Sequence, residues 1–357
     1  MNYDEKYMRR AIQLARNGMI FASPNPMVGA VIVHEDKIIG EGFHRRCGEG
    51  HAEVNAVASV THPELLPHST IYVTLEPCSH YGKTPPCAQL IIDKKIPRVV
   101  IGTLDPFEKV SGRGVKMLQE AGIEVVHGIL EEECRQINPR FIIAHTLHRP
   151  FITLKWAQSK DGFIDHIRTS QTPCAAQFST PISSTFVHKL RATHDAIMVG
   201  SNTIIKDNPT LNCRLWNGNS PQKIILDRKG LVPSFANVFT SNPEYTLYFT
   251  AKERNDITNI VNQTIINEST SLHTVMSILY QRGITSVLIE GGTDLLQNAL
   301  DNNLWDIARV ETAPFSLGQK GEKKAPKITH SPSTSIYIDQ NRVDFYTNNN
   351  LVRVKNS

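Results

Sequence analysis

Strand-like and helix-like segments alternate along this chain of 357 residues, and that alternation constrains its fold more than any single motif. Apolar, β-branched runs in the first half predict strands at 28–34, 37–43, 70–76, 98–102 and 123–128. Apolar residues at helical spacing predict helices at 5–18, 51–60, 86–95 and 112–122. Gly18 is expected to be the C-cap of the first helix. The alternation predicts an α/β domain in which helices cover both faces of a sheet.

The same pattern begins again after residue 147. Strand-like runs lie at 151–159, 195–201, 222–227, 245–250, 286–292 and 307–313. Helical stretches lie at 179–192, 271–283 and 293–301. A chain of this length usually forms more than one domain. We therefore expect two α/β domains, at residues 1–146 and 147–357.

Composition narrows the class of protein. Hydrophobic residues make up 40% of the chain and charged residues 20%, which is typical of a globular protein. The net charge of +4 is too small to indicate a nucleic-acid partner. No apolar run reaches the ~18 residues of a membrane span and no secretory signal is visible, so we expect a cytoplasmic protein without membrane contact. In that setting, six cysteines favour metal binding or reduced thiols over a disulfide framework.

The stretch LEPCSHYGKTPPC places Cys78 and Cys87 after a predicted strand, while His51 and Glu53 open a predicted helix. Thiolates and imidazole suit zinc, and three protein ligands leave a fourth position for water. The order H-x-E, then P-C, then another cysteine is the layout of zinc deaminases, in which the glutamate moves protons without binding the metal. We predict zinc at His51, Cys78 and Cys87. Glu53 is the predicted catalytic residue, provided that its helix directs its N-terminal end at the metal.

Other interpretations remain open for the individual residues. A lone cysteine beside a strand is more often a core residue than a ligand, and eight residues separate this pair where the general deaminase signature has two. A structural zinc site would fill all four positions and would need a fourth ligand such as His80. The remaining cysteines lack such neighbours and are expected to be structural or incidental; they are Cys47, Cys134, Cys174 and Cys213.

The stretches SPNPMVGAVIV, HAEVNAV, LEPCSHYGKTPPC and DPFEKVSGRG closely resemble the bifunctional riboflavin-biosynthesis deaminase–reductase family, over nearly the whole chain. In that family the long spacing between the cysteines is the usual form. The resemblance implies a cytidine-deaminase-like α/β/α zinc domain that removes the amino group at carbon 2 of 2,5-diamino-6-(5-phosphoribosylamino)pyrimidin-4-one. It also implies substrate contacts at Asn25, His44 and Lys83.

For the second half, the resemblance implies a dihydrofolate-reductase-like α/β domain that uses NADPH to reduce the ribose of the aminouracil product to ribitol. The residues give independent support, because Gly291 and Gly292 lie between a predicted strand and helix, where backbone N–H groups can hold a phosphate. A Gly-Gly pair is, however, often only a tight turn. The implied cofactor contacts are Ala157, Gln177, Thr203, Asp207, Arg228, Gly292, Thr293, Asp294, Leu295, Leu296, Gln297 and Asn298. The implied substrate contacts are Ala175, Arg191, Leu211, Arg214 and Glu290.

Charge chemistry suggests roles for the three arginines in these two sets. The guanidinium of Arg228 could meet the 2′-phosphate that distinguishes NADPH from NADH. Arg191 and Arg214 could each donate in a bidentate fork to the substrate phosphate. Taken singly, either of the last two would more simply be a solvated side chain or a salt-bridge partner.

One segment departs from the family pattern. Members usually have a serine and then Trp-Ile-Thr ahead of the helix, whereas this chain has Ala175 and Gln177, and the preceding stretch 165–173 is longer than usual. Loss of an indole removes a large contact surface. We therefore expect altered cofactor or substrate binding at this point.

An alternative function and several properties stay open. Nucleotide and tRNA base deaminases share the zinc layout, so the chain could be such an enzyme with a non-reductase second domain. The small charge and the GGT turn of the second half argue against that alternative. The resemblance suggests a homo-oligomer that acts on a phosphoribosylaminopyrimidine. The loop between the cysteines makes His80, Tyr81 and Lys83 candidates for substrate discrimination.

Overall fold

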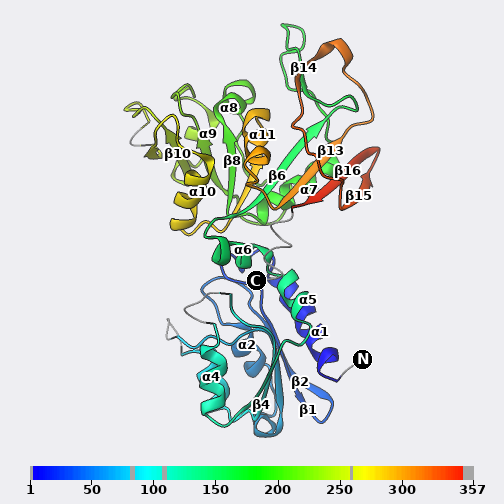
Figure 1. The fold of residues 1–357 in the computed structure, drawn as a ribbon, viewed down its shortest axis with the longest axis vertical. Helices are drawn as coiled ribbons and strands as arrows, with labels where there is room; N and C mark the ends of the chain where they lie inside the picture. Colours follow the sequence, from blue (N-terminus) through cyan, green and yellow to red (C-terminus); the bar gives the residue numbers. More distant parts are fainter. Residues whose placement is uncertain (1–2, 81–84, 107–110, 258–259, 349–357) are drawn as a thin grey trace. The chain divides into compact units, whose positions relative to one another are not determined.

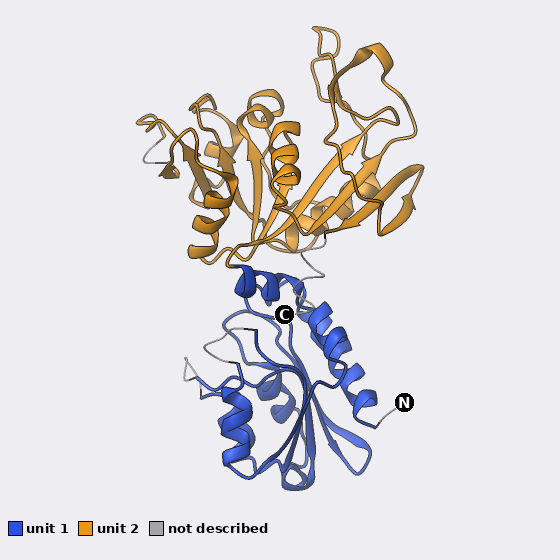
Figure 2. Cartoon of the chain, in the orientation of Figure 1, with its two compact units in different colours: residues 1–147 blue, residues 148–357 orange. Residues whose placement is uncertain are grey.

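The computed structural model describes residues 3–80, 85–106, 111–257 and 260–348. The chain divides into two compact units, Met1–Leu147 and His148–Ser357, which Figure 2 shows in two colours. Each unit has its own sheet and its own apolar cores. Among the described helices, none is long and apolar enough to cross a membrane.

Five strands form the sheet of unit 1, in the order β2-β1-β3-β4-β5 (Figure 1). They are β1 (Gly29–His34), β2 (Lys37–Phe43), β3 (Thr70–Leu75), β4 (Arg98–Thr103) and β5 (Glu124–His127). β1 is antiparallel to β2 and β3, while β3, β4 and β5 are mutually parallel. Glu35 and Asp36 close the predicted hairpin at positive φ (44° and 63°), which matches the twist of paired strands.

Helices cover both faces of this sheet, as the alternation predicted. The helices of unit 1 are α1 (Tyr3–Ala15), α2 (Ala52–Ala58), α3 (Cys87–Asp93), α4 (Arg113–Glu120), α5 (Glu131–Gln136) and α6 (Pro139–Leu147), with 3-10 helices at Arg16–Gly18 and Pro63–His68. One core packs α2, α3 and α4 against strand residues such as Ile32 and Val73. The other packs α1 and α5 against residues such as Val31 and Tyr72.

Gly18 corrects one detail of the expected first helix. The α-helix ends at Ala15, and Gly18 lies in the 3-10 turn that follows, not at a left-handed C-cap. A Cβ atom at Gly18 would lie 2.6 Å from the carbonyl oxygen of His44. Close backbone approach, and not φ, therefore requires glycine at this position.

Nine strands form the main sheet of unit 2, in the order β11-β10-β9-β8-β12-β6-β13-β16-β15 (Figure 1). They are β6 (Phe151–Gln158), β8 (Ala196–Gly200), β9 (Gln222–Leu226), β10 (Thr246–Thr250), β11 (Asn262–Ile265), β12 (Ser286–Glu290), β13 (Ile307–Thr312), β15 (Thr334–Ile338) and β16 (Asn341–Thr347). All neighbours from β11 to β13 are parallel, and β16 and β15 add an antiparallel edge. β7 (Phe163–His166) and β14 (Gly321–Lys324) form a separate two-stranded ribbon.

The helices of unit 2 are α7 (Pro181–Ala192), α8 (Ser201–Asp207), α9 (Asn237–Thr240), α10 (Leu272–Gln281) and α11 (Thr293–Asp301), with 3-10 helices at Pro243–Tyr245 and Gly318–Lys320. One core packs α10 and α11 against β6, β8 and β12, and a second packs α8 and α9 against β8, β9 and β10. Thr180 caps α7, since its side chain accepts a hydrogen bond from the N–H of Ser183 at 3.2 Å.

The predicted strands of unit 2 are present, but several further elements were not expected from the sequence. β7, β11 and β14 have only four residues each, and β15 is exposed along most of its length. The sequences of such strands show little alternation of apolar and polar residues, because no buried face requires it. Hydrogen bonds to the neighbouring strands fix their position instead. α8 and α9 are similarly short, with seven and four residues.

Candidate active sites

The three residues predicted to bind zinc come together where β3 ends. His51 is the N-cap of α2, Cys78 follows β3, and Cys87 is the first residue of α3. Their ligand atoms all lie within 4.8 Å of one another, with His51 Nδ1 3.2 Å from Cys87 Sγ and 3.6 Å from Cys78 Sγ. Imidazole and two thiolates in such a cluster are a donor set that fits zinc.

The backbone at the start of α3 orients the two cysteines. The N–H of Cys87 donates to Cys78 Sγ at 3.3 Å, and the N–H of Ala88 donates to the Cys78 carbonyl at 3.1 Å. Hydrogen bonding from Cys87 and from His51 lowers the pKa of the Cys78 thiol to about 4, against the effect of burial. The pKa of Cys87 is raised in turn by its hydrogen bond to Cys78. These neighbours therefore favour the thiolate form of Cys78, the form in which cysteine binds a metal.

Glu53 lies in the first turn of α2, beside the cysteines, and is only 3% exposed. Burial raises the pKa of Glu53 to about 7, and the negative charge of Cys78 adds to the effect. α2 thus directs its N-terminal end at the ligand cluster, which is the condition stated for Glu53 to share the site. A carboxyl group with a pKa near neutrality can both take up and release a proton.

A cavity of about 760 Å³ opens in front of the cluster. Asn25 and His44, two expected substrate contacts, both line it. Asn25 Nδ2 lies 3.1 Å from His44 Nε2, and His44 Nδ1 lies 3.2 Å from the Gly50 carbonyl. His44 Nδ1 must therefore donate to the Gly50 carbonyl, which leaves Nε2 to accept from Asn25. Burial lowers the pKa of His44, which agrees with a neutral ring.

Glu76, next to the cysteine loop, secures the wall of this cavity. Its carboxylate accepts backbone hydrogen bonds from four residues of the β4–α4 connection and α4: Asp105, Gly112, Gly114 and Val115, at 2.9–3.3 Å. This holds the first turn of α4 against the cavity, where Arg113 lines the wall. The sequence did not single out Glu76, because its partners lie 29 to 39 residues away along the chain. It did not single out Arg113 either.

The three candidates in the inter-cysteine loop differ in outcome. His80 lines the cavity but does not belong to the ligand cluster found among the described residues. Tyr81 and Lys83 lie outside the residues that the structure describes. The remaining four cysteines, all described, form no disulfide and join no metal cluster in the described chain.

Unit 2 contains a second cavity, of about 520 Å³, at the ends of β6, β8 and β12. The expected contacts that line it are Ala157, Ala175, Arg191, Thr203, Asp207, Leu211, Glu290, Gly292, Thr293, Asp294 and Leu296. Gly291 and Gly292 have φ of 97° and 74°, and a Cβ atom on either would lie 3.3–3.6 Å from Thr203 Oγ1. The glycine turn thus forms a bare backbone surface ahead of α11, which fits the phosphates of a dinucleotide.

Other expected contacts do not line this cavity; they are Gln177, Arg214, Arg228, Leu295, Gln297 and Asn298. Leu295 is buried in the core under α11. Arg228 Nη2 donates to the carbonyl of Thr270 at 2.7 Å, and Gln177 donates to the carbonyl of Ser179 at 2.9 Å. Their roles toward the cofactor, and that of Arg214 toward the substrate, therefore remain predictions.

Arg191 and Glu290 are paired at the base of the cavity. Arg191 Nε and Nη2 donate to the two Glu290 oxygens at 2.9 and 2.8 Å. Burial opposes ionisation, but the Arg191 guanidinium lowers the pKa of Glu290 to about 2. Lys155, which the sequence did not single out, also lines the cavity, and burial lowers its pKa.

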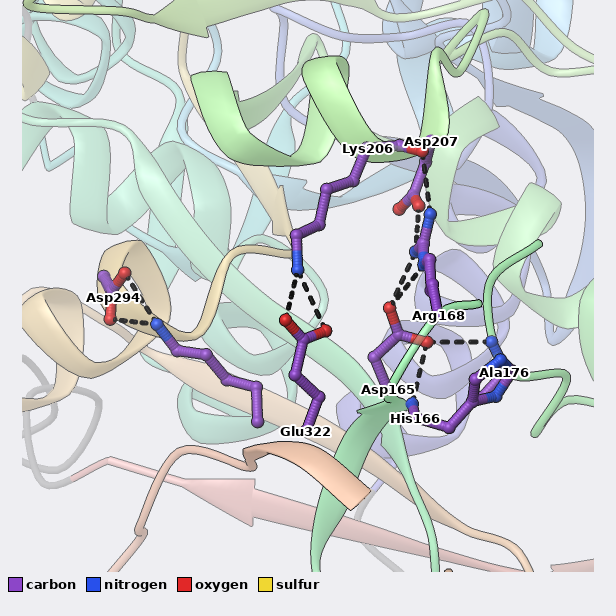
Figure 3. Close-up of polar contacts among 9 residues, drawn as sticks. Asp165, His166, Arg168, Ala176, Lys206, Asp207, Asp294 and Glu322 are labelled. Carbon is purple, nitrogen blue, oxygen red and sulfur yellow. Dashed lines mark hydrogen bonds and ion pairs between the residues drawn. The ribbon is translucent and has the colours of Figure 1, made fainter. Parts of the chain in front are cut away.

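Ion pairs join the β7–β14 ribbon to the helices around this cavity (Figure 3). Lys206 of α8 pairs with Glu322 of β14 at 2.9 Å, and Lys323 of β14 pairs with Asp294 of α11 at 2.8 Å. Arg168, just after β7, pairs with Asp207 at the end of α8. All six of these side chains line the cavity.

Comparison with known proteins defines the class to which these two sites belong. A family model of the cytidine and deoxycytidylate deaminase zinc-binding region matches residues 1–103, and a model of the RibD C-terminal domain matches residues 150–339. The riboflavin biosynthesis protein RibD of Aquifex aeolicus is 39% identical over 320 residues, 88% of each sequence.

Solved structures agree with the sequence comparisons. RibD of Acinetobacter baumannii superposes with a TM-score of 0.87 at 34% identity, over 96% of this chain and 98% of its own. The diaminohydroxyphosphoribosylaminopyrimidine deaminase/5-amino-6-(5-phosphoribosylamino)uracil reductase of Thermotoga maritima gives 0.84 at 37% identity, over 96% and 97%. The molecule is thus a zinc-dependent deaminase joined to a reductase that uses NADPH. The chain belongs to the RibD family of riboflavin biosynthesis enzymes.

Proposed function

We propose that unit 1 removes the amino group at carbon 2 of 2,5-diamino-6-(5-phosphoribosylamino)pyrimidin-4-one, and that unit 2 reduces the ribose of the resulting aminouracil to ribitol. The observation that carries this proposal is the cluster of His51, Cys78 and Cys87 beside the buried Glu53, in a chain whose other unit has a separate cavity with a glycine turn. The Thermotoga maritima relative supports the pairing of the two reactions, since its name includes both a deaminase and a reductase.

In unit 1, His51, Cys78 and Cys87 hold zinc, which when bound makes water acidic enough to supply hydroxide at neutral pH. Glu53 would accept a proton in this site, deliver it to a ring nitrogen of the substrate, and assist the departure of ammonia. Asn25 and His44 line the cavity and contact the pyrimidine substrate. We retain Lys83 as a predicted substrate contact.

In unit 2, the hydride for the reduction would come from NADPH when that cofactor is bound. The glycine turn with Thr293, and Thr203 and Asp207 of α8, hold the cofactor, while Arg191, Leu211 and Glu290 receive the substrate. Because Arg191 is already bidentate to Glu290, its capacity to bind a phosphate depends on sharing or releasing that carboxylate. The domain assignment, homo-oligomeric assembly and a cytoplasmic location are part of the same proposal.

Ammonia release tests the proposed substrate directly. The diaminopyrimidine ribotide should be deaminated in strong preference to cytidine, dCMP and a tRNA anticodon stem, since base deaminases share the zinc layout. NADPH oxidation should then require the aminouracil ribotide. Preference for a cytosine or adenine substrate would contradict the proposed function of unit 1. Deamination without any NADPH consumption would contradict that of unit 2.

A further inference from the structure

An arginine at the edge of the unit 2 cavity has no role in the proposal above. Arg168 lies two residues beyond β7, in the stretch whose length departs from the family pattern. Its side chain is only 18% exposed, although it belongs to an otherwise exposed loop. It lines the cavity together with Asp207 and Ala175.

The guanidinium of Arg168 donates in three directions (Figure 3). Nε donates to Asp165 Oδ2 at 2.8 Å, Nη1 donates to the carbonyl of Lys206 at 2.7 Å, and Nη2 donates to Asp207 Oδ1. One side chain thus joins β7 to the last turn of α8. An arginine can do this because its five N–H donors have a fixed planar geometry.

The last turn of α8 presents a carboxylate and a backbone carbonyl that a cationic donor can stabilise. Asp207 is the last residue of the helix, and Asn208 follows in the left-handed conformation (φ 41°). A carboxylate is disfavoured at a helix C-terminus, where the dipole is negative and the last carbonyl groups have no partner within the helix. Arg168 relieves both problems, because it neutralises Asp207 and donates to the carbonyl of Lys206.

Asp165 extends the same contact to the loop that follows. Its Oδ1 accepts the N–H of His166 and the N–H of Ala176, both at 3.0 Å. Arg168 and Asp165 therefore fasten both ends of the segment 167–176, which carries Ala175 to the cavity. Gln177 does not contribute, since it is exposed and bonded to the carbonyl of Ser179.

We propose that Arg168 is a positioning residue for the reductase reaction, which holds the Asp207 carboxylate and the segment 167–176 in the arrangement that receives the cofactor. The inference rests on the reductase activity of unit 2 and on the cofactor contact of Asp207 proposed above. Arg168 acts through Asp207, so the two residues form one functional unit.

A double-mutant cycle tests this with Arg168→Gln, Asp207→Asn and the combined variant. Arg168→Gln should raise both the dissociation constant and the KM of NADPH roughly tenfold, with a smaller change in kcat. Arg168→Lys should give an intermediate value, since it keeps the charge but not the fork. The combined variant should bind NADPH about as weakly as Asp207→Asn alone, because coupled residues are not additive.

The chain provides its own controls. All three tryptophans lie in unit 2 and Trp156 lines the cavity, so tryptophan fluorescence reports both NADPH binding and unfolding of this unit. Deaminase activity reports unit 1 in the same sample. Arg342→Gln removes an arginine whose ion-pair partner, Asp344, lies on the same strand, β16, and it should leave NADPH binding unchanged.

The possible failures are distinguishable. A wild-type chain that binds NADPH but never oxidises it would count against the reductase function, while the binding cycle would still test Arg168. Unchanged NADPH affinity in Arg168→Gln, or fully additive effects in the cycle, would overturn the inference. A purely structural role would lower the melting temperature while the folded fraction kept its normal KM, and it would overturn the inference too.

Discussion

Glu53 shows how one residue position can carry a reaction. It is buried at the start of α2, beside the ligand cluster, and it lines the cavity in front of that cluster. Its sequence signal was the H-x-E spacing, which puts a carboxylate next to a metal ligand only if the helix N-terminus faces the metal. That arrangement is what the structure has.

Replacing Glu53 by Gln should keep the zinc and the fold but lower the deamination rate on the order of 10²- to 10⁴-fold, the usual contribution of a proton-transfer group. Zinc content by mass spectrometry and ammonia release measure the two effects separately. Glu64→Gln, at a surface glutamate that is 69% exposed, is the matched control and should behave like the wild type. An active Glu53→Gln enzyme would refute the catalytic role.

Glu290 makes the stability of unit 2 depend on pH. Its pKa falls from an ordinary value of 4.5 to about 2 in the folded state, against burial, because of Arg191. A depressed native pKa stabilises the fold fully above pH 4.5 and loses that contribution as the pH falls through about 2. The difference corresponds to about 3 kcal/mol.

Urea unfolding followed by tryptophan fluorescence should therefore show unit 2 losing stability steeply below about pH 5. Glu290→Gln should be less stable at neutral pH, since it leaves the buried Arg191 without its carboxylate partner. Its stability should also fall less steeply as the pH is lowered. Glu253→Gln, at an exposed position, is the control. Equal acid slopes for the Glu290 variant and the wild type would contradict this account.

At the residue scale, the sequence predicted which side chains lie together where their spacing follows the needs of a metal. His51, Cys78 and Cys87 are recognisable because a metal requires particular side chains in a particular order. Arg113, Lys155 and Arg168 were missed, because an isolated cation has the same sequence signal on a surface as in a cavity. Only the fold brings Arg168 to the end of α8, 38 to 39 positions along the chain.

At the scale of elements, α4 contacts the segment at Pro77 and Cys78, and this contact shapes the deaminase cavity. A Cβ atom on Gly114 would lie 2.1 Å from the carbonyl oxygen of Pro77, next to Cys78. The N–H of Gly114 also donates to Glu76 at 2.9 Å. α4 can approach Pro77 and Cys78 this closely only because its second residue is glycine.

Gly114→Ala should therefore displace either α4 or the segment at Pro77 and Cys78. This displacement should lower both zinc retention and deamination by at least tenfold. Zinc retention after dialysis and ammonia release provide the measurements. Gly200→Ala is the control, since a Cβ there has no atom within 4 Å, and unit 1 should not respond to it. Full deaminase activity in Gly114→Ala would contradict this prediction, because it would show that the cavity tolerates a Cβ atom at this position.

Among the strands, the most deeply buried ones were the easiest to predict from the sequence. β1, β3, β4, β8 and β12 are almost wholly buried and stand out as apolar runs. β7 and β14 do not, because their register comes from each other and from ion pairs to α8 and α11. The hydrophobic pattern of the sequence therefore could not predict the β7–β14 ribbon that borders the reductase cavity.

At the scale of the whole molecule, each unit contains a cavity that described residues of that unit line. Removing zinc with a chelator should abolish deamination but leave NADPH-dependent reduction of added aminouracil ribotide within about twofold of its starting rate. Ammonia release and NADPH absorbance report the two activities in one sample. Parallel loss of both activities, restored together by zinc, would mean that the units do not function independently.

The most direct test of the central claim is mass analysis of the products formed from the diaminopyrimidine ribotide, with and without NADPH. The account predicts the deaminated aminouracil ribotide alone when NADPH is absent, and its ribitol form when NADPH is present. Unchanged starting material in both samples, or reduction of the ribose without loss of the amino group, would contradict it.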